Sequence, residues 1–180
     1  AKDLAGLDSA AFLASLAPSP QIAARHTVGL LDPLDASDPR PDLVDGLPVT
    51  LEEVIDTYGN TYFKLKVAGD VPGDIERLVR IAAILDRAVG RYQATIDGNE
   101  QYADADAVAE LMRRMAETPS LDRLRASTLF IEQPIARATA LQKPLGELGL
   151  KMPIIIDESD GDDGALLRAM ALGELQLTMA

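Results

Sequence analysis

Strand-like and helical segments alternate along most of this sequence, with one of each about every 25 to 35 residues. The strand-like segments are residues 61–68, 92–97, 127–134 and 152–159, and a mixed apolar run at 21–32 is the expected first strand. Residues 75–90 and 105–117 carry apolar side chains at helical spacing. This alternation predicts parallel strands joined by right-handed helical crossovers, in either a (β/α)8 barrel or an open doubly wound sheet.

The remaining segments frame this repeat. Residues 4–16 form a predicted helix that the sequence "APSP" ends, and residues 32–48 are rich in proline and aspartate, as in a surface loop. Thr50 and Glu53 have the spacing of a capping box that opens a short helix, which Gly59 closes. Shorter helical stretches are expected at 138–149 and 164–173, and residues 174–180 have the composition of a further strand.

Composition narrows the class of protein. The chain has 180 residues, with 29 acidic side chains against 17 lysines and arginines and a formal net charge of −12. This balance argues against a nucleic-acid surface, because phosphate binding needs clustered cations. The absence of cysteine excludes disulfides and zinc–thiolate sites and suits a cytoplasmic protein. No apolar run reaches the roughly 18 residues of a membrane helix, so no membrane partner is expected.

Three of the predicted strands end in an acidic residue: Asp97, Glu132 and Asp157. Neighbouring members of this set are about one β/α unit apart, and the carboxyl ends of parallel strands lie on one face of the fold. Three carboxylates gathered there would repel one another unless a divalent cation neutralised them. Oxygen ligands without cysteine favour Mg²⁺ over zinc. The sequence therefore predicts a magnesium site.

Two lysines lie in the strand that precedes Asp97. Lys64 and Lys66 are two residues apart, so their side chains share one face of the strand. One interpretation is a solvated edge strand, where lysines prevent aggregation. The other is a pair of cations that points into a barrel beside the carboxylates, where an ammonium near a metal becomes a general base.

Four short motifs on successive strands together resemble the enolase superfamily, in its mandelate racemase and muconate-lactonising branch. They are "KLK" at 64–66, "DGN" at 97–99, "IEQP" at 131–134 and "DES" at 157–159. Each motif is weak by itself, but the set in this order is specific. The resemblance covers roughly residues 20–172.

The resemblance implies an enzyme of isomerase or lyase type that removes the proton α to a substrate carboxylate. Racemisation, epimerisation, dehydration and cycloisomerisation all begin in this way. Mg²⁺ would hold the carboxylate of a small-molecule substrate while the enediolate forms. The implied roles are Lys66 as the base, Lys64 as a stabiliser of the enediolate, Asn99 as a substrate contact, and Asp97, Glu132 and Asp157 as metal ligands.

The resemblance also implies the organisation of the chain. Residues 1–19 are expected to be a helix and linker from a capping domain, and residues 20–180 part of a (β/α)8 barrel, about strands one to five. A partial barrel has open strand edges and is not expected to be active alone; the full-length protein is expected to be a homo-oligomer. Two alternatives remain, namely a Schiff-base lysine barrel of aldolase type and a non-catalytic cation-binding module.

Overall fold

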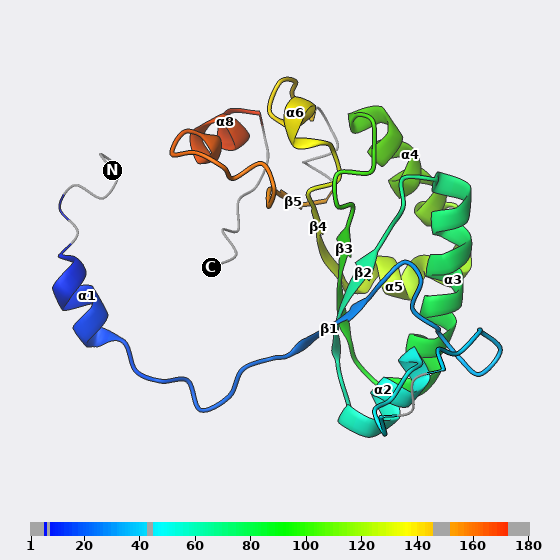
Figure 1. Cartoon of the computed structure of the whole chain (residues 1–180). Coiled ribbons are helices and arrows are strands. Elements are labelled where there is room, and N and C mark those ends of the chain that lie inside the picture. The colour runs from blue at the N-terminus through cyan, green and yellow to red at the C-terminus, as the bar shows by residue number, and fades with distance from the viewer. Residues whose placement is uncertain (1–5, 7, 43–44, 146–151, 173–180) are drawn as a thin grey trace.

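The computed structural model describes residues 6, 8–42, 45–145 and 152–172, and its elements alternate between strand and helix (Figure 1). The strands are β1 (Arg25–Val28), β2 (Tyr62–Lys66), β3 (Gln93–Asp97), β4 (Thr128–Glu132) and β5 (Ile154–Ile155). The helices are α1 (Ser9–Ser15), α2 (Leu51–Tyr58), α3 (Val71–Ala88), α4 (Ala105–Ala116), the 3-10 turn η2 (Pro119–Leu121), α5 (Asp122–Ser127), α6 (Arg137–Ala140) and α8 (Ala165–Ala171).

The five strands form one parallel sheet in the order β1-β2-β3-β4-β5. A doubly wound sheet reverses its strand order at a switch point, whereas a barrel adds each new strand beside the previous one. The sequential order therefore matches strands one to five of a (β/α)8 barrel, and the prediction of a barrel-type α/β fold is confirmed.

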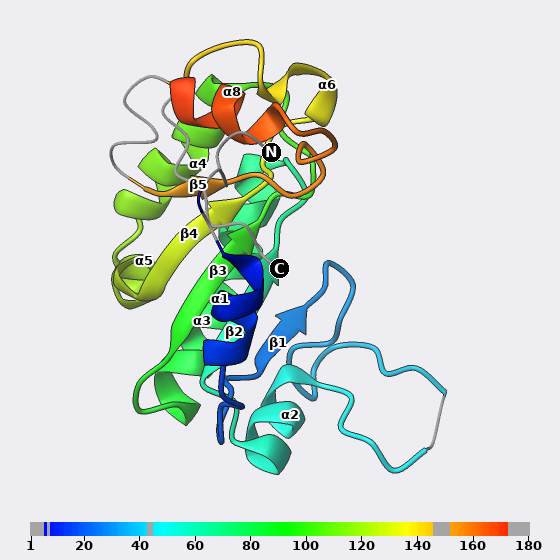
Figure 2. The ribbon, with the colours of Figure 1, turned by 90° about the vertical axis from the view of Figure 1, so that its left-hand side faces the viewer.

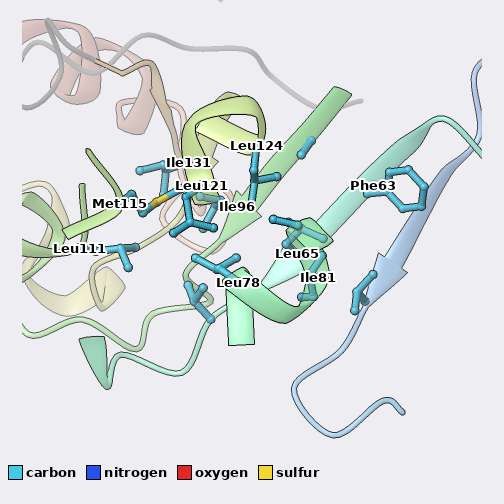
Figure 3. Packing of buried hydrophobic residues seen from close by; sticks show 14 of the residues in the cluster. Phe63, Leu65, Leu78, Ile81, Ile96, Leu111, Met115, Leu121, Leu124 and Ile131 are labelled. Atoms are coloured by element: carbon cyan, nitrogen blue, oxygen red, sulfur yellow. The ribbon is translucent and has the colours of Figure 1, made fainter. Parts of the chain in front are cut away.

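Helices α3, α4 and α5 cover one face of the sheet, while the other face is turned toward the viewer in Figure 2. The core lies between the sheet and these helices (Figure 3). Phe63, Leu65, Ile96 and Ile131 project from the strands, and each is completely buried. They meet apolar side chains of the helices and of η2, which include Leu78, Ile81, Leu111, Met115, Leu121 and Leu124.

Several predicted boundaries agree with the structure. Thr50 and Glu53 form the expected capping box of α2, and Gly59 ends that helix at φ 64°, a conformation that glycine adopts without strain. The first strand is shorter than expected, since only Arg25–Val28 of residues 21–32 pair with β2. Within 138–145, helix α6 ends at Ala140. The strand expected at 174–180 lies outside the described residues.

Candidate active site

The polar face of the sheet carries the predicted site residues at the carboxyl ends of its strands. Phe63 and Leu65 point into the core, so the alternation along β2 turns Lys64 and Lys66 to the opposite face. In the sheet, Lys66 pairs with Asp97 of β3, and Asp97 pairs with Glu132 of β4. Paired residues of parallel strands point to the same side, so both acids share the face of the lysines.

These four charged side chains form one network. Lys64 Nζ donates a hydrogen bond to Glu132 Oε1 at 2.7 Å and lies 3.0 Å from Asp97 Oδ2. Lys66 Nζ lies 3.2 Å from the same Asp97 oxygen. The Glu132 side chain is fully buried, whereas the Lys66 side chain keeps 28% of its exposure. The lysines are therefore partners of the acids and not a solvated edge.

Burial and neighbouring charges shift the pKa values of Lys64 and Glu132 in opposite directions. Burial raises the pKa of the Glu132 carboxyl, and the bond and charge of Lys64 only partly offset this effect. Burial lowers the pKa of Lys64, but the hydrogen bonds and charges of Glu132 and Asp97 outweigh it, so that the pKa of Lys64 is raised. Lys64 therefore stays an ammonium between two carboxylates.

Asn99 connects Lys66 to a further acid. Asn99 Oδ1 accepts a hydrogen bond from Lys66 Nζ at 3.1 Å, and Asn99 Nδ2 donates one to Glu158 Oε1 at 2.6 Å. Asn99 has φ 44°, which a residue other than glycine rarely adopts and which is often found at functional sites. Gly98 precedes it, and a Cβ there would lie 2.4 Å from Pro134 Cα. The loops after β3 and β4 are therefore in close contact.

Two residues of this network were missed by the sequence analysis. Arg25 of β1 donates a hydrogen bond to Thr95 Oγ1 at 2.9 Å, and its Nη2 lies 3.7 Å from Glu132 Oε2. The strand alternation that identified the lysines could also have placed Arg25 on the polar face. Glu158 stands next to the predicted ligand Asp157, and the sequence offers no signal that its side chain would reach Asn99.

Asp157 is separate from the network. The Asp157 side chain is exposed, and the hydrogen bonds described for this residue belong to its backbone: its N–H donates to Gln133 Oε1 at 2.9 Å and its carbonyl accepts from the N–H of Asp160 at 3.0 Å. Over the described ranges, no three histidine, cysteine, aspartate or glutamate side chains are grouped so that they could hold a metal ion. The structure thus brings five of the six predicted site residues together and leaves Asp157 outside.

Asp97 and Glu132 nevertheless suit a hard cation. Both offer carboxylate oxygens from neighbouring strands, which Mg²⁺ prefers. Glu132 Oε2 is buried and accepts no hydrogen bond, with Arg25 Nη2 at 3.7 Å, so this oxygen could coordinate an ion. In the described structure, the ammonium of Lys64 occupies the position between the two carboxylates.

The fold and the site together define a parallel, barrel-type α/β protein with a lysine–carboxylate cluster at the carboxyl ends of its strands. No protein-family model and no curated protein sequence matches the chain. Among solved structures, muconate lactonizing enzyme from Mycobacterium smegmatis matches with 28% identity and a TM-score of 0.50, over 68% of this chain and 32% of that one. The same enzyme complexed with muconolactone matches with 26% identity and a TM-score of 0.51, over 68% and 31%.

A more distant match is o-succinylbenzoate synthase from Thermosynechococcus elongatus, which was solved with magnesium in its active site. It has 18% identity and a TM-score of 0.49, over 68% of this chain and 38% of that one. The present chain spans about a third of the length of the muconate lactonizing enzyme that it matches. In fold and in sequence, the chain resembles the enolase superfamily, and the resemblance inferred from the four motifs is confirmed. No helix among the described residues is long and apolar enough to cross a membrane.

Proposed function

We propose that the protein that carries this chain removes the proton α to the carboxylate of a small-molecule substrate and stabilises the enediolate that forms. One observation carries the proposal: Lys64 lies within 3.0 Å of carboxylate oxygens of Asp97 on β3 and Glu132 on β4, and Lys66 lies 3.2 Å from Asp97. A proton α to a carboxylate is weakly acidic, so its removal needs a base, and it needs a positively charged group beside the oxyanion that forms. This cluster contains side chains for both tasks.

The surroundings of the two lysines support different roles for them. Lys66 is the more exposed lysine and is paired with one acid and with Asn99, so it can approach a substrate. As a neutral amine, Lys66 Nζ would take the α-proton, while the electron pair of the broken C–H bond moves into the carboxylate to form the enediolate. Lys64, held by two acids, remains charged and would stabilise the new negative charge.

We propose Mg²⁺ as the cofactor. Asp97 and Glu132 would hold it, with Asp157 as the third ligand that the family resemblance implies. The ion would supply positive charge at the substrate carboxylate. Asp157 and Lys64 would both have to move relative to the described structure, Asp157 toward the two acids and Lys64 away from the position between them.

The reaction that follows proton removal would be an isomerisation or an elimination, catalysed by a homo-oligomer of the intact protein. Racemisation, epimerisation, dehydration and cycloisomerisation share the same first step, so exchange of the α-proton with D₂O measures this step whatever the final product is. Muconolactone, the ligand of one matched structure, is the first compound to test. A wider panel of small carboxylic acids would follow.

The test compares variants of the intact protein. Lys66→Ala is expected to abolish α-proton exchange in D₂O, followed by NMR, while Mg²⁺ binding in a calorimeter survives. Lys143→Ala, at an exposed lysine, is the control and should leave both unchanged. Persistent exchange in Lys66→Ala would disprove the assignment of the base. Trapping of substrate by borohydride without any need for metal would instead support a Schiff-base lysine.

A further inference from the structure

Gln133 follows Glu132 directly and is almost completely buried, with 1% of its surface exposed. Its side-chain amide makes four hydrogen bonds, the maximum that a glutamine amide can form. Oε1 accepts from the backbone N–H groups of Asp157 and Ser159 at 2.9 and 3.0 Å. Nε2 donates to Ile135 O at 2.7 Å and to Ser159 Oγ at 2.8 Å. Because two of the partners are backbone donors, a single orientation of the amide satisfies the whole set.

The backbone of Gln133 also makes hydrogen bonds to β5 and to the segment after β3. Its N–H donates to Ile155 O of β5 at 2.9 Å, and its carbonyl accepts from the N–H of Glu100, after β3, at 2.8 Å. The residue adopts φ 30°, a strained conformation for a residue other than glycine. Such a conformation persists where the surroundings hold it firmly. Gln133 is therefore fixed to the segments after β3 and β5 at once.

The segment that Gln133 holds carries one acid, Glu158, to the edge of the site. β5 ends at Ile155, so no strand pairing fixes the chain beyond that residue. The two N–H groups that donate to Gln133 Oε1 flank Glu158. The carboxylate of Glu158 accepts from Asn99, which in turn accepts from Lys66. The side chain of one glutamine thus sets where the chain after β5 meets the lysines and acids of the site.

We infer that Gln133 is a positioning residue: its amide fixes the backbone of Asp157 and Ser159 after β5 and so places the carboxylate of Glu158, which lies between them, against Asn99 beside the cluster on β2, β3 and β4. This inference rests on the proposed function, because it concerns the geometry of the same metal and proton-transfer site. Gln133 itself touches no reacting atom.

The decisive variant is Gln133→Glu, which has the same shape. Its carboxylate cannot donate to Ile135 O and is repelled by that carbonyl oxygen, so we expect it to turn away and weaken the bonds from the two N–H groups. Ser159→Ala is a milder second variant, since it removes one of the four hydrogen bonds and no backbone contact. Gln142→Glu is the matched control, because that side chain makes a single hydrogen bond, to Ala138 O.

Two measurements in the intact protein separate positioning from general damage. Without metal, amide hydrogen exchange at Asp157 and Ser159 should speed up in Gln133→Glu, while the amides of α3 keep their protection. Calorimetry should show Mg²⁺ affinity reduced by about 10–100-fold, as expected when a group that orients metal ligands is lost. Ser159→Ala should shift both readouts in the same direction by less, and excess Mg²⁺ should restore α-proton exchange.

The inference is overturned if amide protection and Mg²⁺ affinity stay at the wild-type level in both Gln133→Glu and Ser159→Ala. Should Gln133→Glu fail to fold, Ser159→Ala decides. Failure of the proposed function gives a different pattern, in which α-proton exchange persists in Lys66→Ala. The faster amide exchange of Gln133→Glu, measured without metal or substrate, would then still establish the positioning role.

Discussion

The two faces of the sheet are built from alternate residues of the same strands, yet they have opposite physical properties. On β2, Phe63 and Leu65 are completely buried against the helices, whereas Lys64 and Lys66 keep 14% and 28% of their side-chain exposure on the other face. The apolar face stabilises the folded protein, because it removes apolar surface from water. The other face places charges in a partly dry environment, where each needs an opposite charge. Alternate residues of β2 therefore have separate roles: Phe63 and Leu65 stabilise the fold, and the two lysines belong to the candidate site.

The largest expected effect belongs to the apolar face. Phe63 is fully buried and contacts the ring of Tyr92 edge to face, with the two ring centroids 6.4 Å apart. Phe63→Ala is expected to lower the free energy of unfolding by about 3–5 kcal/mol, because the cavity that it leaves is lined by packed side chains. Urea unfolding of the intact protein measures this loss.

Tyr62 provides the control, since it is the preceding residue on the opposite face and is 38% exposed. Tyr62→Ala should change the free energy of unfolding by less than about 0.5 kcal/mol, as is usual at surface positions. Equal losses in Phe63→Ala and Tyr62→Ala would contradict the division of the strand into an apolar and a polar face.

On the polar face, the largest expected effect is that of Lys64. Lys64→Met keeps the length of the side chain but leaves Asp97 and the fully buried Glu132 facing each other without the ammonium. We expect a loss of about 3 kcal/mol at pH 7, the lower end of the range for breaking a buried ion pair, because Lys64 is not fully buried. Urea unfolding in the presence of a chelator measures it.

Added Mg²⁺ sharpens this prediction. If the two carboxylates bind the ion, Mg²⁺ should restore more stability to Lys64→Met than it adds to the wild-type protein, because it replaces the missing charge. Lys143→Met, at an exposed position, is the control and should unfold like the wild type with and without the ion. A Lys64→Met variant as stable as this control would show that the ion pair contributes nothing.

The sequence predicted the fold and most of the candidate site for a simple reason. Alternation along a strand determines which side chains share a face, and parallel pairing puts the strand ends together. These two rules are sufficient to bring Lys64, Lys66, Asp97 and Glu132 into one cluster. Asn99, two residues beyond Asp97, was found by its place in the "DGN" motif and indeed contacts Lys66.

The rules fail where regular pairing ends. β5 has only two paired residues, so the direction of Asp157 and Glu158 depends on loop contacts and not on strand alternation. Those contacts come from Gln133, whose four side-chain hydrogen bonds reach residues 2 to 26 positions away in the sequence. A buried glutamine in a loop has no periodicity that could reveal such partners. Arg25 differs, since strand alternation could have placed it on the polar face, although the sequence analysis did not single it out.

The smallest effect is a pH dependence that distinguishes a buried acid from an exposed one. Burial raises the pKa of Glu132 above its ordinary value of 4.5, so the folded protein holds this proton more tightly than the unfolded chain. The contribution of Glu132 to stability must therefore fall as the pH rises from 4.5 through the pKa of the folded state. Glu132→Gln removes this titration. The difference in the free energy of unfolding, wild type minus Glu132→Gln, should decrease between pH 4 and pH 7 with chelator present.

Glu53, in the capping box of α2, should show the opposite slope. Hydrogen bonds from Arg40 and from the backbone lower its pKa to about 2, so its contribution is complete above pH 4.5 and is lost as the pH falls toward 2. Wild type minus Glu53→Gln should therefore increase with pH over that range. The two curves should have opposite slopes because the Glu132 side chain is fully buried at the end of β4, while Glu53 is stabilised as an anion at the surface. Curves of the same sign would mean that the charge of Lys64, and not burial, dominates the environment of Glu132.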